Sequence, residues 1–220
     1  VGGWHCKELE SMPIDFVAID FETANSDRDS ACALGVACVE GGKIVSRHYT
    51  LLNPQTTFHD FCTYIHGINE SAVKDAPDFG EIFPALYQML EGKRVVAHNA
   101  GFDVGVLEAS CQSRNLPMPD ILPYDSVDMA RTAWPHLEKH KLSALAKTFN
   151  LPLKNHNAAE DATACAMLVL KACQEFQADS LEELILALEK KAARDAARRQ
   201  AEAKRQAKLI QEQKRSGGGQ

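Results

Sequence analysis

Two carboxylates close the first apolar segment of the chain. The run IDFVAID at residues 14–20 predicts a buried strand, and Asp20 and Glu22 lie at its end. Since side chains alternate along a strand, both carboxylates face the same side of the sheet. Hard oxygen ligands of this kind suit Mg²⁺ or Mn²⁺. Such a pair arises by chance about once in a chain this long, but acids that close a buried strand are costly unless paired or ligated.

A third carboxylate, Asp103, ends the segment HNAGFD, which directly follows the apolar run Arg94–Ala97. This strand-to-helix junction places Asp103 in the first turn of a helix, at the sheet edge where Asp20 is expected. Stabilisation of the helix N-terminus, worth about 0.3–1 kcal/mol, explains a single acid there equally well. His98, Asn99 and Phe102 are candidates for substrate contact, although their local pattern favours turn positions for the first two and a core position for Phe102.

A histidine and a fourth carboxylate open the long helical pattern that begins near Ala158. His156 and Asp161 are five residues apart in HNAAEDATACAMLVL. A neutral imidazole, with a pKa of about 6.5, can take a proton from an attacking water. A lone histidine at a helix start is more often a surface or capping residue. Glu160 and Asp125 are alternative acids that we rank below Asp161.

The remaining pattern predicts an α/β fold with a central mixed five-stranded sheet. Two strand-like runs are separated by Gly41-Gly42, a hairpin signal, so the first three strands should form an antiparallel meander. After a helix near Phe79–Leu90, strands and helices alternate, which implies parallel strands with helices against the sheet. The expected strands are 14–20, 31–40, 43–52, 94–97 and 121–124, and the expected later helices are 102–114, 142–149 and 158–176. The segment 53–77 is expected to be irregular.

The length of 220 residues and a hydrophobic fraction of 45% allow one substantial core. We expect one domain over residues 12–180 and a charged, basic helical or disordered C-terminal tail over residues 181–220. The segment Glu189–Arg215 contains ten Lys/Arg and four Asp/Glu, so its net charge is +6 and that of the rest of the chain is −12. An acidic body is unlike a protein that simply coats nucleic acid, but it fits clustered carboxylates that hold cations.

Seven scattered cysteines form no metal or redox pattern and are expected to be reduced thiols. The sequence contains neither an apolar run long enough to span a bilayer nor the apolar core of a secretory signal at its start. We therefore expect a cytoplasmic protein that does not associate with membranes.

The combination of motifs resembles the DEDD superfamily of 3′→5′ exonucleases, whose ribonuclease H-like fold is shared by the DNA polymerase III epsilon proofreading subunit and RNase T. The family's D-x-E-T matches Asp20–Thr23, its H-N-x-x-F-D matches His98–Asp103, and its H-x4-D matches His156–Asp161. Ile65–Ile68 is similar to the short I-H-G-I element. Asn157 stands where a tyrosine marks the other subclass, so His156 assigns the chain to the histidine subclass.

The resemblance implies hydrolysis of nucleic acid from its 3′ end with two divalent cations, Mg²⁺ or Mn²⁺. Asp20, Glu22, Asp103 and Asp161 would hold the metals, with Asp20 bridging them, and His156 would act as general base. By the same resemblance Thr23 and the segment after it help to hold the terminal nucleotide, and His66 belongs to the substrate side. Residues 24–27, Ala-Asn-Ser-Asp, replace the family's usual Thr-Gly, which leaves recognition of the strand end open.

Three alternatives remain at this stage. The same site would serve an RNA exonuclease, because the contacts that sense a 2′-hydroxyl have no visible signature; single-stranded DNA is slightly favoured. A binding subunit without activity could dock a polymerase or another protein partner through its C-terminal helix. The basic tail could itself bind nucleic acid, although charge runs are usually solvated helix faces.

Overall fold

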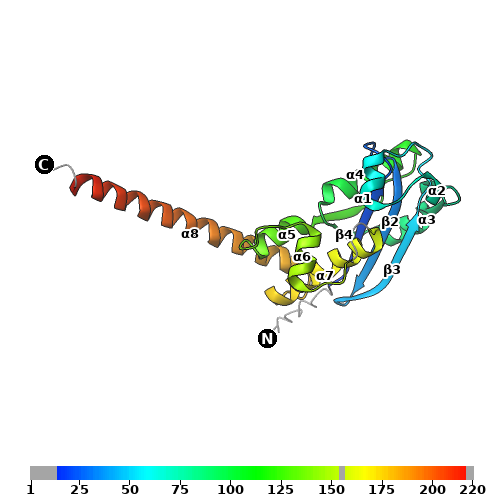
Figure 1. The fold of residues 1–220 in the computed structure, drawn as a ribbon. Helices are drawn as coiled ribbons and strands as arrows, with labels where there is room; N and C mark the ends of the chain where they lie inside the picture. The colour runs from blue at the N-terminus through cyan, green and yellow to red at the C-terminus, as the bar shows by residue number, and fades with distance from the viewer. Residues whose placement is uncertain (1–13, 154–156, 217–220) are drawn as a thin grey trace, which may run out of the picture.

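A five-stranded sheet forms the centre of the protein (Figure 1). The computed structural model describes residues 14–153 and 157–216, with side chains up to residue 210. The strand order is β3-β2-β1-β4-β5; β1 pairs antiparallel with β2 and β2 with β3, whereas β1 and β4, and β4 and β5, are parallel. The strands are β1 (Phe16–Thr23), β2 (Ala31–Glu40), β3 (Lys43–Leu51), β4 (Lys93–Ala97) and β5 (Ile121–Asp125). The expected mixed sheet, with its meander and two parallel strands, is confirmed.

Helices cover both faces of this sheet. Alternate residues of β1 belong to different cores: Phe16 and Ala18 pack with the helices α5 to α8, whereas Val17 and Ile19 pack with α3 and α4. Asp20 and Glu22 have the same parity as Phe16 and therefore face the α7 side. The helices are α1 (Asp60–His66), α2 (Glu70–Val73), α3 (Phe79–Leu90), α4 (Ala100–Ser113), α5 (Ser126–Ala133), α6 (Leu142–Phe149), α7 (Ala158–Phe176) and α8 (Leu181–Ser216).

Three short helices were not expected. α1 and α2 lie in the segment that the sequence predicts to be irregular, and α5 follows β5 directly. Each begins at a capping side chain: His59 accepts from the N–H of Phe61, Asn69 from that of Ala72, and Asp125 from that of Val127. α1 buries none of its residues and α2 buries one, so neither shows an apolar stripe in the sequence.

α7 crosses the sheet at a very short distance from β2. A Cβ atom built on Gly35 would lie 2.0 Å from the carbonyl oxygen of Ala158, the first residue of α7. Gly35 is also the partner of Asp20 in the β1–β2 ladder. The missing side chain therefore lets the N-terminus of α7 rest directly on the sheet beside Asp20.

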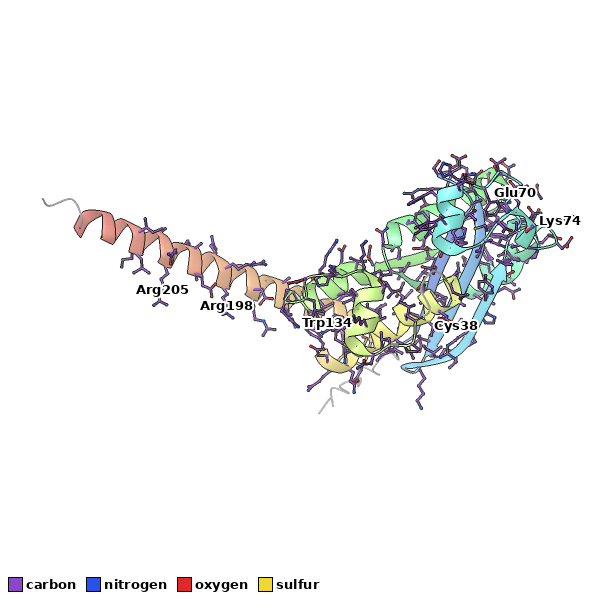
Figure 2. All side chains as sticks on the ribbon, viewed as in Figure 1. Cys38, Glu70, Lys74, Trp134, Arg198 and Arg205 are labelled. Atoms are coloured by element: carbon purple, nitrogen blue, oxygen red, sulfur yellow. The ribbon has the colours of Figure 1, made fainter. Side chains whose placement is uncertain are left out.

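α8 begins in the core and continues away from it (Figure 1). Leu181, Leu184 and Leu188 are buried in the core shared with α7, and Arg94 of β4 forms an ion pair with Glu182. Beyond these turns the helix projects from the domain, and Arg198 and Arg205 lie on this projecting part (Figure 2). Among the residues that the structure describes, no helix combines the length and apolar character that a membrane span requires.

The two parts of α8 should differ in their contribution to stability. Truncation after residue 192 removes turns in which no described residue is buried, so the thermal midpoint should stay close to that of the full chain. Truncation after residue 180 also removes Leu181, Leu184 and Leu188, each worth about 1.5–3 kcal/mol of burial, and should lower the midpoint strongly. Equal midpoints for the two truncations in a thermal denaturation series would contradict this.

Candidate active site

Three carboxylates from two elements converge beside the end of β1. One oxygen from each of Asp20, Glu22 and Asp161 lies within 4.8 Å of the other two, and all three residues are partly buried. Asp20 and Glu22 come from β1, and Asp161 comes from the first turn of α7, which Gly35 allows onto the sheet. The spacing suits hard oxygen ligands gathered around a divalent cation.

Asp103, the fourth predicted carboxylate, approaches from α4 and is only 2% exposed. Its Oδ1 accepts a hydrogen bond of 2.8 Å from the backbone N–H of Phe21, which lies between Asp20 and Glu22. This bond joins α4 to β1 across 82 residues of sequence. The structure thus brings together all four acids, with Asp103 outside the tight group of three but adjacent to it.

The crowding of these acids disfavours their ionised forms. Burial, followed by the charges of Asp103, Asp161 and Glu22, raises the pKa of Asp20 well above its usual value. Burial and Asp161 raise the pKa of Glu22 to about 7. Burial also raises the pKa of Asp103 to about 7, although the N–H of Phe21 works in the opposite direction. A divalent cation would compensate for this repulsion, so the donor set fits a metal site.

His156 lies outside the described residues, and its role as general base stays a prediction. The next residue, Asn157, is the N-cap of α7, where its side-chain oxygen accepts from the N–H of Glu160 (3.2 Å). The Asp161 N–H donates to the Asn157 carbonyl (2.9 Å). The backbone on which Asp161 stands is therefore fixed at the start of the helix.

Two other predicted histidines form backbone contacts that hold the site in place. The Nδ1 of His66 accepts from the N–H of Ile68 (3.0 Å), so its Nε2 carries the proton and donates to the carbonyl of Thr23 (3.1 Å). Thr23 itself is only 9% exposed. His98 contacts Ser126 through Nδ1 (2.8 Å) and the carbonyl of His140 through Nε2 (2.9 Å). Burial lowers the pKa of His98. Contacts of Thr23, His66 and His98 with substrate stay predictions.

Asp125, which we named from the sequence as an alternative to Asp161, caps two helices. Its carboxylate accepts from the N–H groups of Asn99 (3.2 Å) and Ala100 (3.1 Å) at the start of α4, and from Val127 (2.8 Å) in α5. Asn99 adopts a left-handed conformation with φ of 82°. In the sequence, an aspartate between a strand and a helix is the pattern that predicts this capping role.

The core position expected for Phe102 is wrong, because its side chain is 36% exposed. Phe102 is in the first turn of α4, directly before the buried Asp103. The exposed ring keeps Phe102 available for the substrate contact that the motif predicts.

The sequence profile of the Exonuclease (RNase_T) family matches residues 17–169, which include the strand carrying Asp20 and Glu22, Asp103 in α4, and Asp161 in α7. The chain belongs to the Exonuclease family. It is 33% identical, over 170 residues, to a DNA polymerase III PolC-type protein of Caldanaerobacter subterraneus subsp. tengcongensis, covering 76% of the chain and 12% of the relative. It is 28% identical, over 166 residues, to the 3′-5′ exonuclease DinG of Bacillus subtilis, covering 74% and 18%.

Solved structures share the fold of this member of the Exonuclease family. Exonuclease X, in a complex with 5′ overhanging duplex DNA, is 25% identical with a TM-score of 0.61, over 79% of this chain and 99% of that one. A 3′-exonuclease that recognises the 3′ end of histone mRNA stem-loop is 14% identical with a TM-score of 0.63, over 75% and 83%, and shows the fold alone. The chain spans only 11% to 19% of the length of the curated relatives described by these matches.

The raised carboxylate pKa values should make the metal-free protein less stable at alkaline pH. In the unfolded chain Glu22 ionises at about its ordinary value of 4.5, whereas in the folded chain it stays protonated until about 7. The contribution of Glu22 to the free energy of unfolding is therefore fully present below pH 4.5 and is lost as the pH rises through 7. Thermal midpoints in EDTA should fall between pH 5 and pH 8.

Two comparisons separate this effect from other titrations. Glu22→Gln should flatten the fall, whereas Glu160→Gln, which changes an acid of the same helix turn as Asp161, should leave it unchanged. Mg²⁺ or Mn²⁺ at pH 8 should raise the wild-type midpoint, because ligands stabilise the state that binds them. A metal-free midpoint that is flat or that rises over this range would show that the site is not a repulsive carboxylate cluster.

Proposed function

We propose that this chain is a metal-dependent 3′-5′ exonuclease that releases nucleoside monophosphates from the 3′ end of single-stranded DNA. The observation that carries the proposal is the convergence of Asp20, Glu22 and Asp161 within 4.8 Å, beside the buried Asp103, in a member of the Exonuclease family. The gathering of all four acids also argues against a binding subunit without activity.

Asp20, Glu22, Asp103 and Asp161 would hold two Mg²⁺ or Mn²⁺ ions. Bound metals of this kind acidify an attacking water and stabilise the leaving oxygen. His156 takes the proton from the water as the water oxygen bonds to phosphorus. The bond from phosphorus to the 3′-oxygen then breaks, and this oxygen takes up a proton from solvent water. The step releases the terminal nucleotide as a 5′-monophosphate and leaves a new 3′-hydroxyl.

DNA is favoured as the substrate because of the relatives. Proteins named as DNA polymerase III are among the matches, and exonuclease X was solved with DNA. RNA is the main competing substrate, since a 3′-exonuclease of histone mRNA has the same fold.

The six cysteines within the described residues are unpaired thiols, which supports a cytoplasmic location.

We further propose that residues 12–180 form the exonuclease domain and that residues 181–220 form an extension whose projecting part contacts a protein partner. Support comes from the family match, which ends at residue 169, and from the exposed Leu209 and Ile210 near the end of the described part of α8. Leu181, Leu184 and Leu188 nevertheless pack into the domain, so we assign the partner contact to the turns beyond residue 192.

Digestion of 5′-labelled single-stranded DNA and RNA oligonucleotides, with Mg²⁺, Mn²⁺ or EDTA, tests the function. Wild type should give a ladder that shortens from the 3′ end, on DNA faster than on RNA, and only with metal. Asp20→Asn and Asp161→Asn should abolish the ladder because each removes a metal ligand. His156→Ala should slow it by about 10²–10⁴-fold, the usual contribution of a general base.

Glu160→Gln is the matched control for Asp161→Asn, because it neutralises the adjacent acid of α7 and should retain most activity. Faster cleavage of RNA would replace the substrate in the proposal without changing the chemistry. Absence of metal-dependent cleavage of both polymers by folded wild type would reject the exonuclease proposal in favour of a binding role.

A further inference from the structure

The loop after β1 is held in a defined shape. The backbone N–H of Ala24 donates to the carbonyl of Ser30 (2.8 Å) and closes the loop. Within it, the Asn25 side chain accepts from the N–H of Asp27 (2.8 Å) and donates to the carbonyl of Thr57 (2.9 Å). These residues stand where the family usually has Thr-Gly, so this chain has its own loop at the end of β1.

The ordered loop carries the Arg28 side chain onto α4. The Nη1 of Arg28 donates to the carbonyl of Gly101 (2.9 Å) in the first turn of that helix. A Cβ atom at Gly105, one turn later, would lie 1.6 Å from the same Nη1. Gly105 is buried although it has no side chain to bury. Since glycine is unfavourable inside a helix, its presence is explained by the guanidinium that occupies this space.

This position places a cation at the N-terminal end of α4, the helix that carries Asp103. Gly101 is two residues before Asp103 and directly before the exposed Phe102, within a single turn of α4. The neighbouring acids of the loop, Asp27 and Asp29, instead line a cavity together with Ser113 and Arg114 at the opposite end of α4. The Arg28 guanidinium instead contacts the N-terminal end of α4, where Asp103 lies.

Most of the donors of this guanidinium remain available. Within the described part of the chain, Arg28 forms the bond to Gly101 and no ion pair, and its side chain is exposed. A guanidinium offers a planar set of N–H groups that matches phosphate oxygens. A cation beside an exposed aromatic ring is also the combination that single-strand binding surfaces use.

We infer that Arg28, seated on Gly101 and Gly105, binds a phosphodiester group of the substrate strand next to the nucleotide that is removed. The inference rests on the proposed exonuclease function and adds a substrate-binding residue to it. Four acids at the metal site would repel the anionic strand beyond the phosphate that the metals contact. A fixed guanidinium at this edge offsets that repulsion for the adjacent phosphate.

Binding of a 5′-fluorescein-labelled oligothymidylate, measured by anisotropy at several salt concentrations, tests the inference. The measurement uses full-length protein with Mg²⁺ and the inactivating Asp20→Asn substitution. Adding Arg28→Gln should weaken binding by roughly tenfold. The slope of log K against log salt should fall by about 0.7, the value for one phosphate contact on a single strand. In otherwise wild-type protein, KM should rise with little change in kcat.

Gly105→Ala tests the contact of the Arg28 guanidinium with α4 without changing Arg28 itself. The new methyl group displaces the end of a flexible side chain, so the variant should fold, and it should weaken binding about as much as Arg28→Gln does. Combined with Arg28→Gln, it should add nothing further. Arg47→Gln, at an exposed position of the edge strand β3, is the matched control and should leave affinity and salt slope unchanged.

The outcomes separate this inference from the proposed function. Metal-dependent cleavage by wild type with unchanged affinity and salt slope in Arg28→Gln would overturn the role of Arg28 alone. A lower thermal midpoint in Arg28→Gln with an unchanged salt slope would also overturn it, because that result assigns Arg28 to loop packing. Independent, additive effects of Gly105→Ala and Arg28→Gln would contradict the inference that Gly105 acts by leaving space for the Arg28 guanidinium.

Discussion

The close contact between Gly35 and the first residue of α7 is the constraint on which the site depends. Asp20 stands opposite Gly35 in the ladder, and Asp161 stands one turn into α7. Any side chain at position 35 would meet the Ala158 carbonyl, and relief of that overlap would move Asp161 away from β1. A single missing methyl group therefore sets the spacing of carboxylates that come from segments about 140 residues apart.

Bringing these acids together opposes folding, and the surrounding structure offsets part of this cost. The Phe21 N–H stabilises the Asp103 carboxylate, and the packed cores on both faces of the sheet keep the first turns of α4 and α7 in place. The remaining repulsion is relieved by protonation or by cations. Affinity for a divalent metal and marginal local stability without it thus have the same physical origin.

Polar side chains around the carboxylates act mainly on the backbone. Asp125 joins the starts of α4 and α5, His98 joins α5 to the segment before α6, and His66 joins the end of α1 to Thr23. The loops next to the site are therefore connected to each other by hydrogen bonds. Arg28 extends this network to the place where the loop after β1 meets α4.

Much of the architecture could be predicted from local patterns. Alternation in β1, the Gly41-Gly42 turn and the order of the acidic motifs identify the sheet, its mixed pairing and the four carboxylates, because each is encoded by residues close in sequence. The helices α1, α2 and α5, the exposure of Phe102 and the seat of Arg28 could not be predicted in this way. They depend on capping side chains, and on contacts between distant segments. The bond from Arg28 to Gly101, for example, spans 73 residues, and no local periodicity predicts a partner so far along the chain.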